Sequence, residues 1–407
     1  MNIEYFISKK LFTTKEKNNS YTKPILSIAI LAVAISVAVM LISLMVVIGF
    51  KNDISSKIIG FGSHITINNF SNNNSYESDP IISNENIYSS ISEIEGIDNI
   101  NVYATKAAII KTKDEIHGTV LKGVSDDYNW DFFNENLIAG EVLNLNSDSK
   151  SPNVLISEEI SKLLKLNVSD DLVMYFLQDP PRVRKFKIKG IYNTAMVDFD
   201  KLYVIADIKH IQSLNSWTDK QVGGFEISIN DFKNLESITN EVYDRIPYDL
   251  NAQSIKEKAP QIFDWLKLQD VNVKVILILM LLVAGINMIT ALLILILERT
   301  RLIGILKALG ATNWSIRKLF LYIALRLTLK GLLLGNGIAL FFAFIQKKFS
   351  LIALDPETYY MKTVPINFDF MQIIILNIST LVICYLILVI PSIIISRITP
   401  IKAIRFQ

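Results

Sequence analysis

The chain has 407 residues, of which 51% are hydrophobic, and its mean hydropathy of +0.35 is too high for an ordinary water-soluble protein. Charged residues still make up 20% of the sequence, so we expect a membrane protein with a large water-exposed domain. The formal net charge is only +2, and no nucleic-acid partner is expected.

Charge is distributed unevenly along the chain. Residues 51–270 hold 33 acidic and 22 basic side chains, whereas residues 1–23 hold five lysines and two glutamates. The last eleven residues hold three basic side chains and no acid. Because basic segments next to membrane spans stay on the cytoplasmic side, both termini are expected in the cytoplasm and the acidic middle outside it. The one cysteine, Cys384, lies in an apolar segment and is expected only to fill space there.

The first membrane span is expected at residues 24–50, after a cytoplasmic segment at residues 1–23. The span is an uncharged run of 27 residues, longer than the ~20 that cross a bilayer. The run is too long for the apolar part of a signal peptide, about 7 to 15 residues, so we expect an uncleaved span.

Residues 51–270 are expected to form an α+β domain, because alternating segments typical of strands are mixed with helical segments without a regular βαβ repeat. The predicted strands cover residues 64–67, 102–111, 116–122, 172–177, 183–192, 202–206 and 224–229. The predicted helices begin near Asn84 and cover residues 157–166, 208–214 and 232–246. Two strands flank a turn with two prolines at residues 178–181, and because proline cannot donate to a ladder, this turn is expected to project from a sheet edge.

Three more apolar segments predict a protein with four transmembrane helices. The second span is expected at residues 271–297, the third at 316–345 and the fourth at 371–396. The remaining residues form connections: a basic cytoplasmic segment at 298–315, a short outer loop at 346–370 and a cytoplasmic tail at 397–407.

The segment between the second and third spans, residues 298–313, reads ERTRLIGILKALGATN. Three basic side chains place it on the cytoplasmic side, namely Arg299, Arg301 and Lys307. Apolar residues at helical spacing predict a short amphipathic helix that ends at Gly310; they include Ile303, Leu306 and Leu309. The pattern alone is equally compatible with an interfacial helix that binds no partner.

Residues 298–312 closely resemble the coupling segment of the ABC permeases of the MacB/FtsX class, and most closely that of the LolC/LolE lipoprotein-releasing transmembrane subunits. Residues 45–54, 354–360 and 364–366 resemble the same family, and the order of elements in residues 51–270 resembles the MacB-like periplasmic core domain. One departure is Leu302, which stands where the family often has an acidic residue.

The resemblance implies a non-catalytic permease subunit of the bacterial inner membrane, with residues 51–270 in the periplasm. A separate ATPase similar to LolD would use ATP and Mg and dock on the coupling segment. The docking residues implied are Glu298, Arg299, Arg301, Ile303, Gly304, Leu306, Lys307, Leu309 and Gly310. Further implied partners are a second permease subunit, identical or homologous, membrane lipid, a lipoprotein substrate and a periplasmic lipoprotein carrier similar to LolA.

Two other sites are expected. In the family a hairpin receives the carrier, and the corresponding, shorter hairpin here consists of Gln178, Asp179, Pro180, Pro181 and Arg182. A lateral substrate cavity is expected between the first two spans, lined by Met40, Leu44, Val47, Val283, Ile286 and Met288.

Motifs for catalysis or metal binding are missing from the sequence. The nearest approach to a phosphate-binding loop, Gly118–Ser125, has Val124 where a lysine must reach the phosphates. The three histidines, His64, His117 and His210, stand singly rather than at the spacing of metal ligands. We therefore expect no catalytic residue, no metal site and no cofactor bound by this chain.

Two alternative functions stay open. A MacB-type efflux permease would share the coupling segment and export a drug or peptide. A regulator like FtsX would use the same ATP-driven motion to activate a cell-wall hydrolase. The sequence also does not distinguish a LolC-like from a LolE-like chain, or a homodimer from a heterodimer of permeases.

Overall fold

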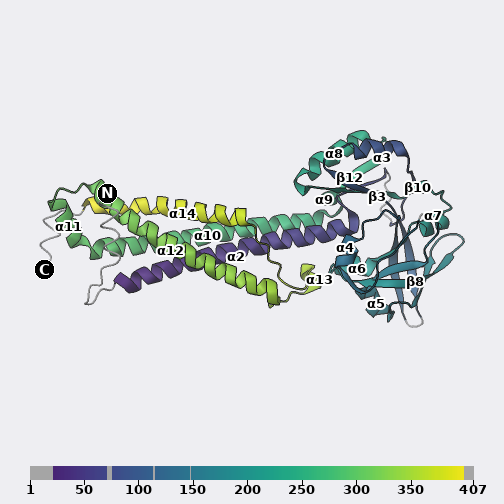
Figure 1. Cartoon of the computed structure of the whole chain (residues 1–407), viewed down its shortest axis with the longest axis horizontal. Helices are drawn as coiled ribbons and strands as arrows, with labels where there is room; N and C mark the ends of the chain where they lie inside the picture. The colour runs from purple at the N-terminus through teal and green to yellow at the C-terminus, as the bar shows by residue number, and fades with distance from the viewer. Residues whose placement is uncertain (1–21, 71–75, 113–114, 147, 398–407) are drawn as a thin grey trace. The chain divides into compact units, whose positions relative to one another are not determined.

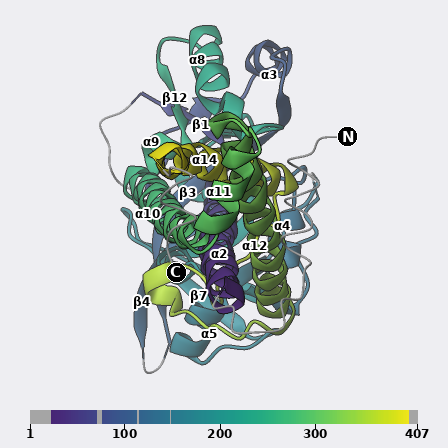
Figure 2. The ribbon, with the colours of Figure 1, turned by 90° about the vertical axis from the view of Figure 1, so that its left-hand side faces the viewer.

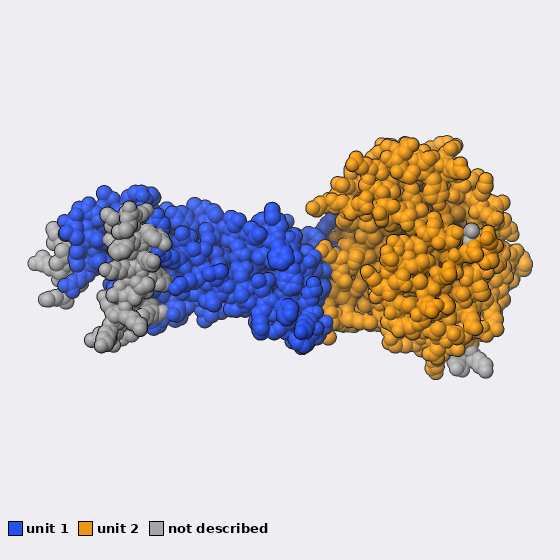
Figure 3. Space-filling view, in the orientation of Figure 1, with its two compact units in different colours: residues 1–51, 265–352, 364–407 blue, residues 52–264, 353–363 orange. Residues whose placement is uncertain are grey.

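The computed structural model describes residues 22–70, 76–112, 115–146 and 148–397. The chain divides into two compact units, which Figure 3 shows in different colours. We call residues 1–51, 265–352 and 364–407 the helical unit, and residues 52–264 and 353–363 the sheet unit. Most of the two predicted terminal segments, 1–23 and 397–407, lies outside the described residues, namely residues 1–21 and 398–407.

Within the described residues, four helices are long and apolar enough to cross a membrane. They are α2 (Thr22–Gly62), α10 (Pro260–Glu298), α12 (Asn313–Phe349) and α14 (Phe370–Ser392), shown in Figure 1. Two short helices accompany them: α11 (Thr300–Ala308) lies between α10 and α12 in the sequence, and α15 (Ile394–Arg397) follows α14. Four candidate spans with an α+β domain between the first two confirm the predicted fold class.

The first helix is longer than the sequence suggested. α2 does not end near Phe50 but continues to Gly62, because Ile54, Ile58 and Phe61 recur at helical spacing and are all buried. At ~1.5 Å per residue such a helix exceeds the ~30 Å of a hydrocarbon core. Residues 52–62 of α2 belong to the sheet unit.

Glycines let two of the long helices approach closely. A Cβ at Gly331 of α12 would clash with Val33 of α2, and one at Gly335 would lie 2.6 Å from the carbonyl oxygen of Ala34. Small residues at helix crossings allow this close packing in membranes, where dispersion rather than the hydrophobic effect holds helices together. α12 is also bound to α14, because Asn336 and Asn377 exchange side-chain hydrogen bonds of 2.7 and 3.0 Å.

The sheet unit is built on a sheet of ten strands in the order β12-β1-β11-β3-β4-β9-β6-β8-β5, with β7 pairing with β3 and β8. The strands are β1 (Ile65–Asn69), β3 (Ile97–Lys111), β4 (Ile116–Val124), β5 (Leu137–Gly140), β6 (Asn153–Ser157), β7 (Asp171–Phe176), β8 (Arg182–Tyr192), β9 (Tyr203–Asp207), β11 (Gly224–Ile229) and β12 (Leu250–Ser254). A second, small sheet pairs β2 (Ile81–Ile82) with β10 (Gln221–Val222).

The predicted hairpins are present in this sheet. β3 and β4 pair antiparallel, with Lys111 opposite Ile116, and β7 and β8 pair with Phe176 opposite Arg182. The strands β5, β6 and β12 were not predicted, since β5 is only four residues long and mostly exposed and β6 is a short, continuously apolar run that periodicity alone cannot assign.

Short helices surround the sheet. They are α3 (Glu85–Ser92), α4 (Asp131–Glu135), α5 (Glu158–Leu164), α6 (Val197–Leu202), α7 (Lys209–Asn215), α8 (Leu235–Arg245), α9 (Ile255–Lys258), α13 (Pro356–Tyr359) and the 3-10 turn η1 (Phe232–Asn234). α13 lies in the short loop between α12 and α14, and this loop belongs to the sheet unit through residues 353–363. There Lys57 of α2 donates a hydrogen bond of 3.1 Å to the carbonyl oxygen of Tyr360.

Candidate functional site

α11 connects the second and third candidate spans, and the end of the helical unit that carries it faces the viewer in Figure 2. The helix ends as predicted: Gly310 has a left-handed φ of +91°, and the Ala311 amide donates to the carbonyl oxygen of Leu306. Glycine adopts this conformation without strain, and the pairing satisfies the last helical carbonyls.

Two of the predicted docking residues face inward. Ile303 and Gly304 are buried, and Ile303 belongs to the hydrophobic core of the helical unit. Leu306 is half-buried against the same core. Ile303 thus packs α11 against the helical unit, and a direct part of Ile303 and Gly304 in docking stays a prediction.

The exposed face of α11 consists of other residues. Arg301, Ile305, Ala308 and Leu309 recur at intervals of three and four and are all exposed. Leu309 is 79% exposed and Ile305 44%. Trp314, at the start of α12, is 58% exposed. We call Arg301, Ile305, Ala308, Leu309 and Trp314 the α11 face.

The polar residues of the predicted set have different roles. Glu298 and Gly310 are exposed and Arg299 is half-buried. Lys307 donates a hydrogen bond of 2.9 Å to the carbonyl oxygen of Ile395 in α15, and desolvation lowers the pKa of its ammonium group. Lys307 thus ties α11 to α15 within the helical unit and positions the helix.

The turn between β7 and β8, predicted to project from a sheet edge, is hydrogen-bonded to a neighbouring helix. Gln178 donates to the carbonyl oxygen of Leu214 over 3.2 Å, and Arg182 donates to that of Ser213 over 3.0 Å, so both ends of the turn are bound to α7. Asp179, Pro180 and Pro181 remain exposed. Beside them lie three exposed apolar side chains, Tyr175, Leu177 and Val183, of which Leu177 is 72% exposed.

The six residues predicted to line a substrate cavity do not share one environment. Met40 and Met288 are buried in the core of the helical unit, and their role as lining residues stays a prediction. Leu44 is half-buried against that core and Val47 is half-buried. Val283 and Ile286 are exposed on α10. Helical spacing placed each residue on its span but could not show which face packs inward.

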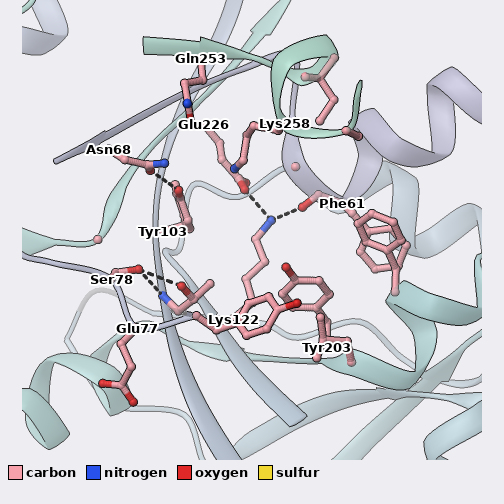
Figure 4. A pocket seen from close by; sticks show the side chains of 18 of the residues that line it. Phe61, Asn68, Glu77, Ser78, Tyr103, Lys122, Tyr203, Glu226, Gln253 and Lys258 are labelled. Atoms are coloured by element: carbon pink, nitrogen blue, oxygen red, sulfur yellow. Dashed lines mark hydrogen bonds and ion pairs between the residues drawn. The ribbon is translucent and has the colours of Figure 1, made fainter. Parts of the chain in front are cut away.

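A site that the sequence did not predict lies at the end of α2. The carbonyl oxygen of Phe61 accepts a hydrogen bond from the ammonium group of Lys122 on β4 (Figure 4). The same ammonium group forms an ion pair of 2.7 Å with Glu226 on β11. Lys122 and Glu226 are almost completely buried. A helix leaves its last carbonyl groups without partners, and here a buried lysine supplies one.

The ring of Phe61 is enclosed by aromatic side chains of the sheet unit. Five ring centroids lie 5.1 to 6.2 Å from its own; they belong to Phe132, Phe133, Tyr192, Phe199 and Tyr203. These separations are typical of stabilising aromatic pairs, each worth about 0.5 to 1.5 kcal/mol beyond area burial. We call Phe61, these five rings, Lys122 and Glu226 the α2 anchor. It fixes the last turn of α2 in the core of the sheet unit.

Comparison with known proteins gives two family matches. Residues 26–244 match the family described as MacB-like periplasmic core domain, and residues 274–400 match the family described as FtsX-like permease C-terminal. Together the matches cover most of the sheet unit and most of the helical unit.

Similar proteins cover nearly the whole chain at low identity. The chain is 22% identical to the lipoprotein-releasing system transmembrane protein LolC of Buchnera aphidicola subsp. Schizaphis graminum, over 88% of each chain. It is 20% identical to LolC of Neisseria meningitidis serogroup B over 100% of this chain and 99% of that one, and 20% identical to LolE of Haemophilus influenzae over 94% of each. Among solved structures, the periplasmic region of MacB from Actinobacillus actinomycetemcomitans is 16% identical with a TM-score of 0.34, covering 50% of this chain and 95% of that one.

The α2 anchor can be tested by removing its cation. Lys122→Met should destabilise the sheet unit by about 3 to 5 kcal/mol, because Glu226 would remain buried without its ion-pair partner. The measurement is chemical unfolding of the purified full chain, followed by near-ultraviolet circular dichroism of the aromatic side chains.

Lys256→Met is the matched control, since Lys256 pairs with Glu236 over 3.0 Å at an exposed site. Such surface pairs contribute about 1 kcal/mol or less. Equal losses in the two variants would show that the buried pair does not hold the anchor together.

Proposed function

The chain belongs to the family of permeases that combine a MacB-like periplasmic core domain with an FtsX-like permease C-terminal region, and from this membership we propose that it is a lipoprotein-releasing permease subunit of an ABC transporter. The proposal is supported by the sequence similarity of this chain to relatives named LolC and LolE, which extends over most of the length of both chains. As a permease subunit it is not itself an enzyme, and ATP and Mg are used by a separate ATPase.

The proposed orientation follows from charge. α11 and the start of α12 carry Arg299, Arg301, Lys307, Arg317 and Lys318, and basic residues beside spans resist translocation. This segment is therefore cytoplasmic, as are both termini after an even number of spans. The sheet unit, connected between the first and second spans, then lies in the periplasm of a cell with an inner membrane.

The α11 face is the proposed docking surface of the ATPase. The observation that carries this assignment is the exposure of Ile305 and Leu309 at α11, whose opposite side is bound to the helical core, and of Trp314 at the start of α12. Exposed apolar side chains next to cationic ones are typical of protein interfaces. A helix fixed in this way transmits a push from a bound partner to α10 and α12 rather than rotating freely.

The substrate is proposed to enter from the outer leaflet and to leave for a periplasmic carrier. Each CH₂ group of an acyl chain gains ~0.8 kcal/mol in an apolar environment, so a released lipoprotein needs a carrier that covers its chains. The exposed apolar residues Tyr175, Leu177 and Val183 beside the β7–β8 turn are the proposed carrier contact. A second permease subunit completes the assembly.

Copurification of the tagged chain distinguishes the lipoprotein function from its alternatives. Radiolabelled lipoproteins together with an ATPase are expected. An outer-membrane tunnel protein would instead identify an efflux permease, and a cell-wall hydrolase would identify a signalling regulator.

The docking surface is tested by the double variant Ile305→Asp with Leu309→Asp. Since burying each side chain at an interface contributes about 1.5 to 3 kcal/mol, ATPase affinity should fall by about a hundredfold or more. Binding of the purified ATPase to the full chain is the measurement.

Ile116→Asp serves as the control, because Ile116 is 66% exposed but lies on β4 of the sheet unit. It should leave ATPase binding unchanged. Unaltered affinity in the double variant would remove the coupling role of the α11 face.

The carrier contact is tested separately by Leu177→Asp. Loss of one buried leucine should weaken binding of a LolA-like carrier to the full chain about tenfold or more, with ATPase binding intact. Leu163→Asp, at a 44% exposed leucine of α5, provides the comparison. If both variants bind the carrier like the parent, the β7–β8 hairpin is not the contact.

A further inference from the structure

A cavity of about 610 Å³ lies within the sheet unit, next to the α2 anchor. Its volume is in the range of sites that hold small molecules, about 300 to 1,000 Å³. Residues of the last turns of α2 line one part of it, and Ile255, Lys258 and Ala259 of the α9 region line another. α2 is itself one of the long helices, and α9 is followed directly by another, α10, which begins at Pro260.

The lining combines aromatic rings with hydrogen-bonding groups. Tyr103, Tyr203, Phe61 and Phe199 contribute rings, and Asn68, Asn251 and Gln253 contribute amides. Burial raises the pKa of Tyr203 to about 12, so its phenol stays neutral and able to donate a hydrogen bond. Such a mixture orients a small ligand through polar contacts while the rings cover its apolar part.

Some of the charged side chains that line the cavity form ion pairs, and one lysine does not. Lys122 is paired with Glu226, and Glu77 is paired with Lys106 over 2.8 Å. Lys258 is different: among the residues that the structure describes, no acceptor lies within hydrogen-bond distance of its ammonium group. Its side chain points into the same space as that of Glu226 (Figure 4) and remains accessible within the cavity.

Lys258 is exposed, so water reaches its ammonium group. Desolvation lowers the pKa of this group, Glu226 raises it and Lys122 lowers it. Because no carboxylate in the described part of the chain is hydrogen-bonded to it, an anionic ligand group would supply the missing ion-pair partner. Asp79 and Asp198 also line the cavity, so a ligand with a cationic group as well would match both signs of charge.

We propose that this cavity binds a small zwitterion, an amino acid or short peptide, whose carboxylate pairs with Lys258 and whose body lies against the rings of Tyr103 and Tyr203. This binding site is independent of the proposed transport function. A bound ligand would contact both the end of α2 and α9, and so would favour one arrangement of these two segments within the sheet unit.

The test uses the dipeptide Gly-Phe as probe. Calorimetric titration of the full chain in phosphatidylcholine nanodiscs should show saturable binding. The C-terminal amide of Gly-Phe, which lacks the carboxylate, should bind about tenfold more weakly or worse, because the charge pair with Lys258 is lost. N-acetyl-Gly-Phe, which lacks the ammonium group, should also bind more weakly than the parent dipeptide.

Variants assign the effect to one residue. Lys258→Gln should weaken Gly-Phe binding about as much as amidation does, whereas Lys258→Arg, which keeps the charge, should retain it. Lys256→Gln is the matched control, because Lys256 lies on the same short helix but does not line the cavity. It should bind like the parent chain.

Three results would overturn the proposal. One is the absence of saturable Gly-Phe binding up to about 10 mM, since a dissociation constant above this concentration corresponds to no useful affinity. Another is equal affinity for Gly-Phe in the parent and in Lys258→Gln. The third is tighter binding of glycerophosphoethanolamine than of Gly-Phe, which would identify a lipid head group as the ligand in place of a peptide carboxylate.

Discussion

The core of the sheet unit depends on the contacts that the buried ammonium group of Lys122 makes. It bonds to Glu226 and to the carbonyl oxygen of Phe61, so one cation joins β4, β11 and the end of α2. Charges in a protein interior are costly unless they are paired and hydrogen-bonded, and Lys122 has both an ion-pair partner and a carbonyl acceptor. The aromatic rings around Phe61 pack against the last turn of α2. The last turn of the first long helix is thereby part of the core of the sheet unit.

A different kind of packing holds the helical unit together. Glycines at 331 and 335 bring α12 against α2, and the Asn336–Asn377 pair joins α12 to α14. α11 is bound to this bundle by Ile303 on its inner side and by Lys307, which donates to α15. A partner that pushes on the opposite, exposed side of α11 would therefore move helices and not a loose loop. In the proposed function, that push comes from ATP-driven closure of the partner ATPase.

Local patterns in the sequence were sufficient for much of the architecture. Four apolar runs predicted the candidate spans, the alternation around residues 112–115 predicted the β3–β4 hairpin, and Gly310 predicted the end of α11. Orientation about a helix axis was not predictable, because α11 is apolar on several faces and only packing into the core of the helical unit buries Ile303 while leaving Ile305 exposed. The burial of Met40 and Met288 was not predictable for the same reason. The Lys122–Glu226 pair spans 104 positions and exists because β4 and β11 flank β3, an arrangement that no local pattern reveals.

In the proposed function, the push on α11 reaches the sheet unit through α2, because α2 packs against α12 in the helical unit and its residues 52–62 belong to the sheet unit. The most direct measurement is hydrogen exchange of residues 52–62 in the complex of the chain with its ATPase, in membranes, with and without ATP. The account predicts that ATP alters exchange at the end of α2 in the parent complex, and that substitution of the α11 face abolishes this response. If the hydrogen-exchange rate of residues 52–62 in the parent complex is the same with and without ATP, while the ATPase is bound and active, the account is contradicted.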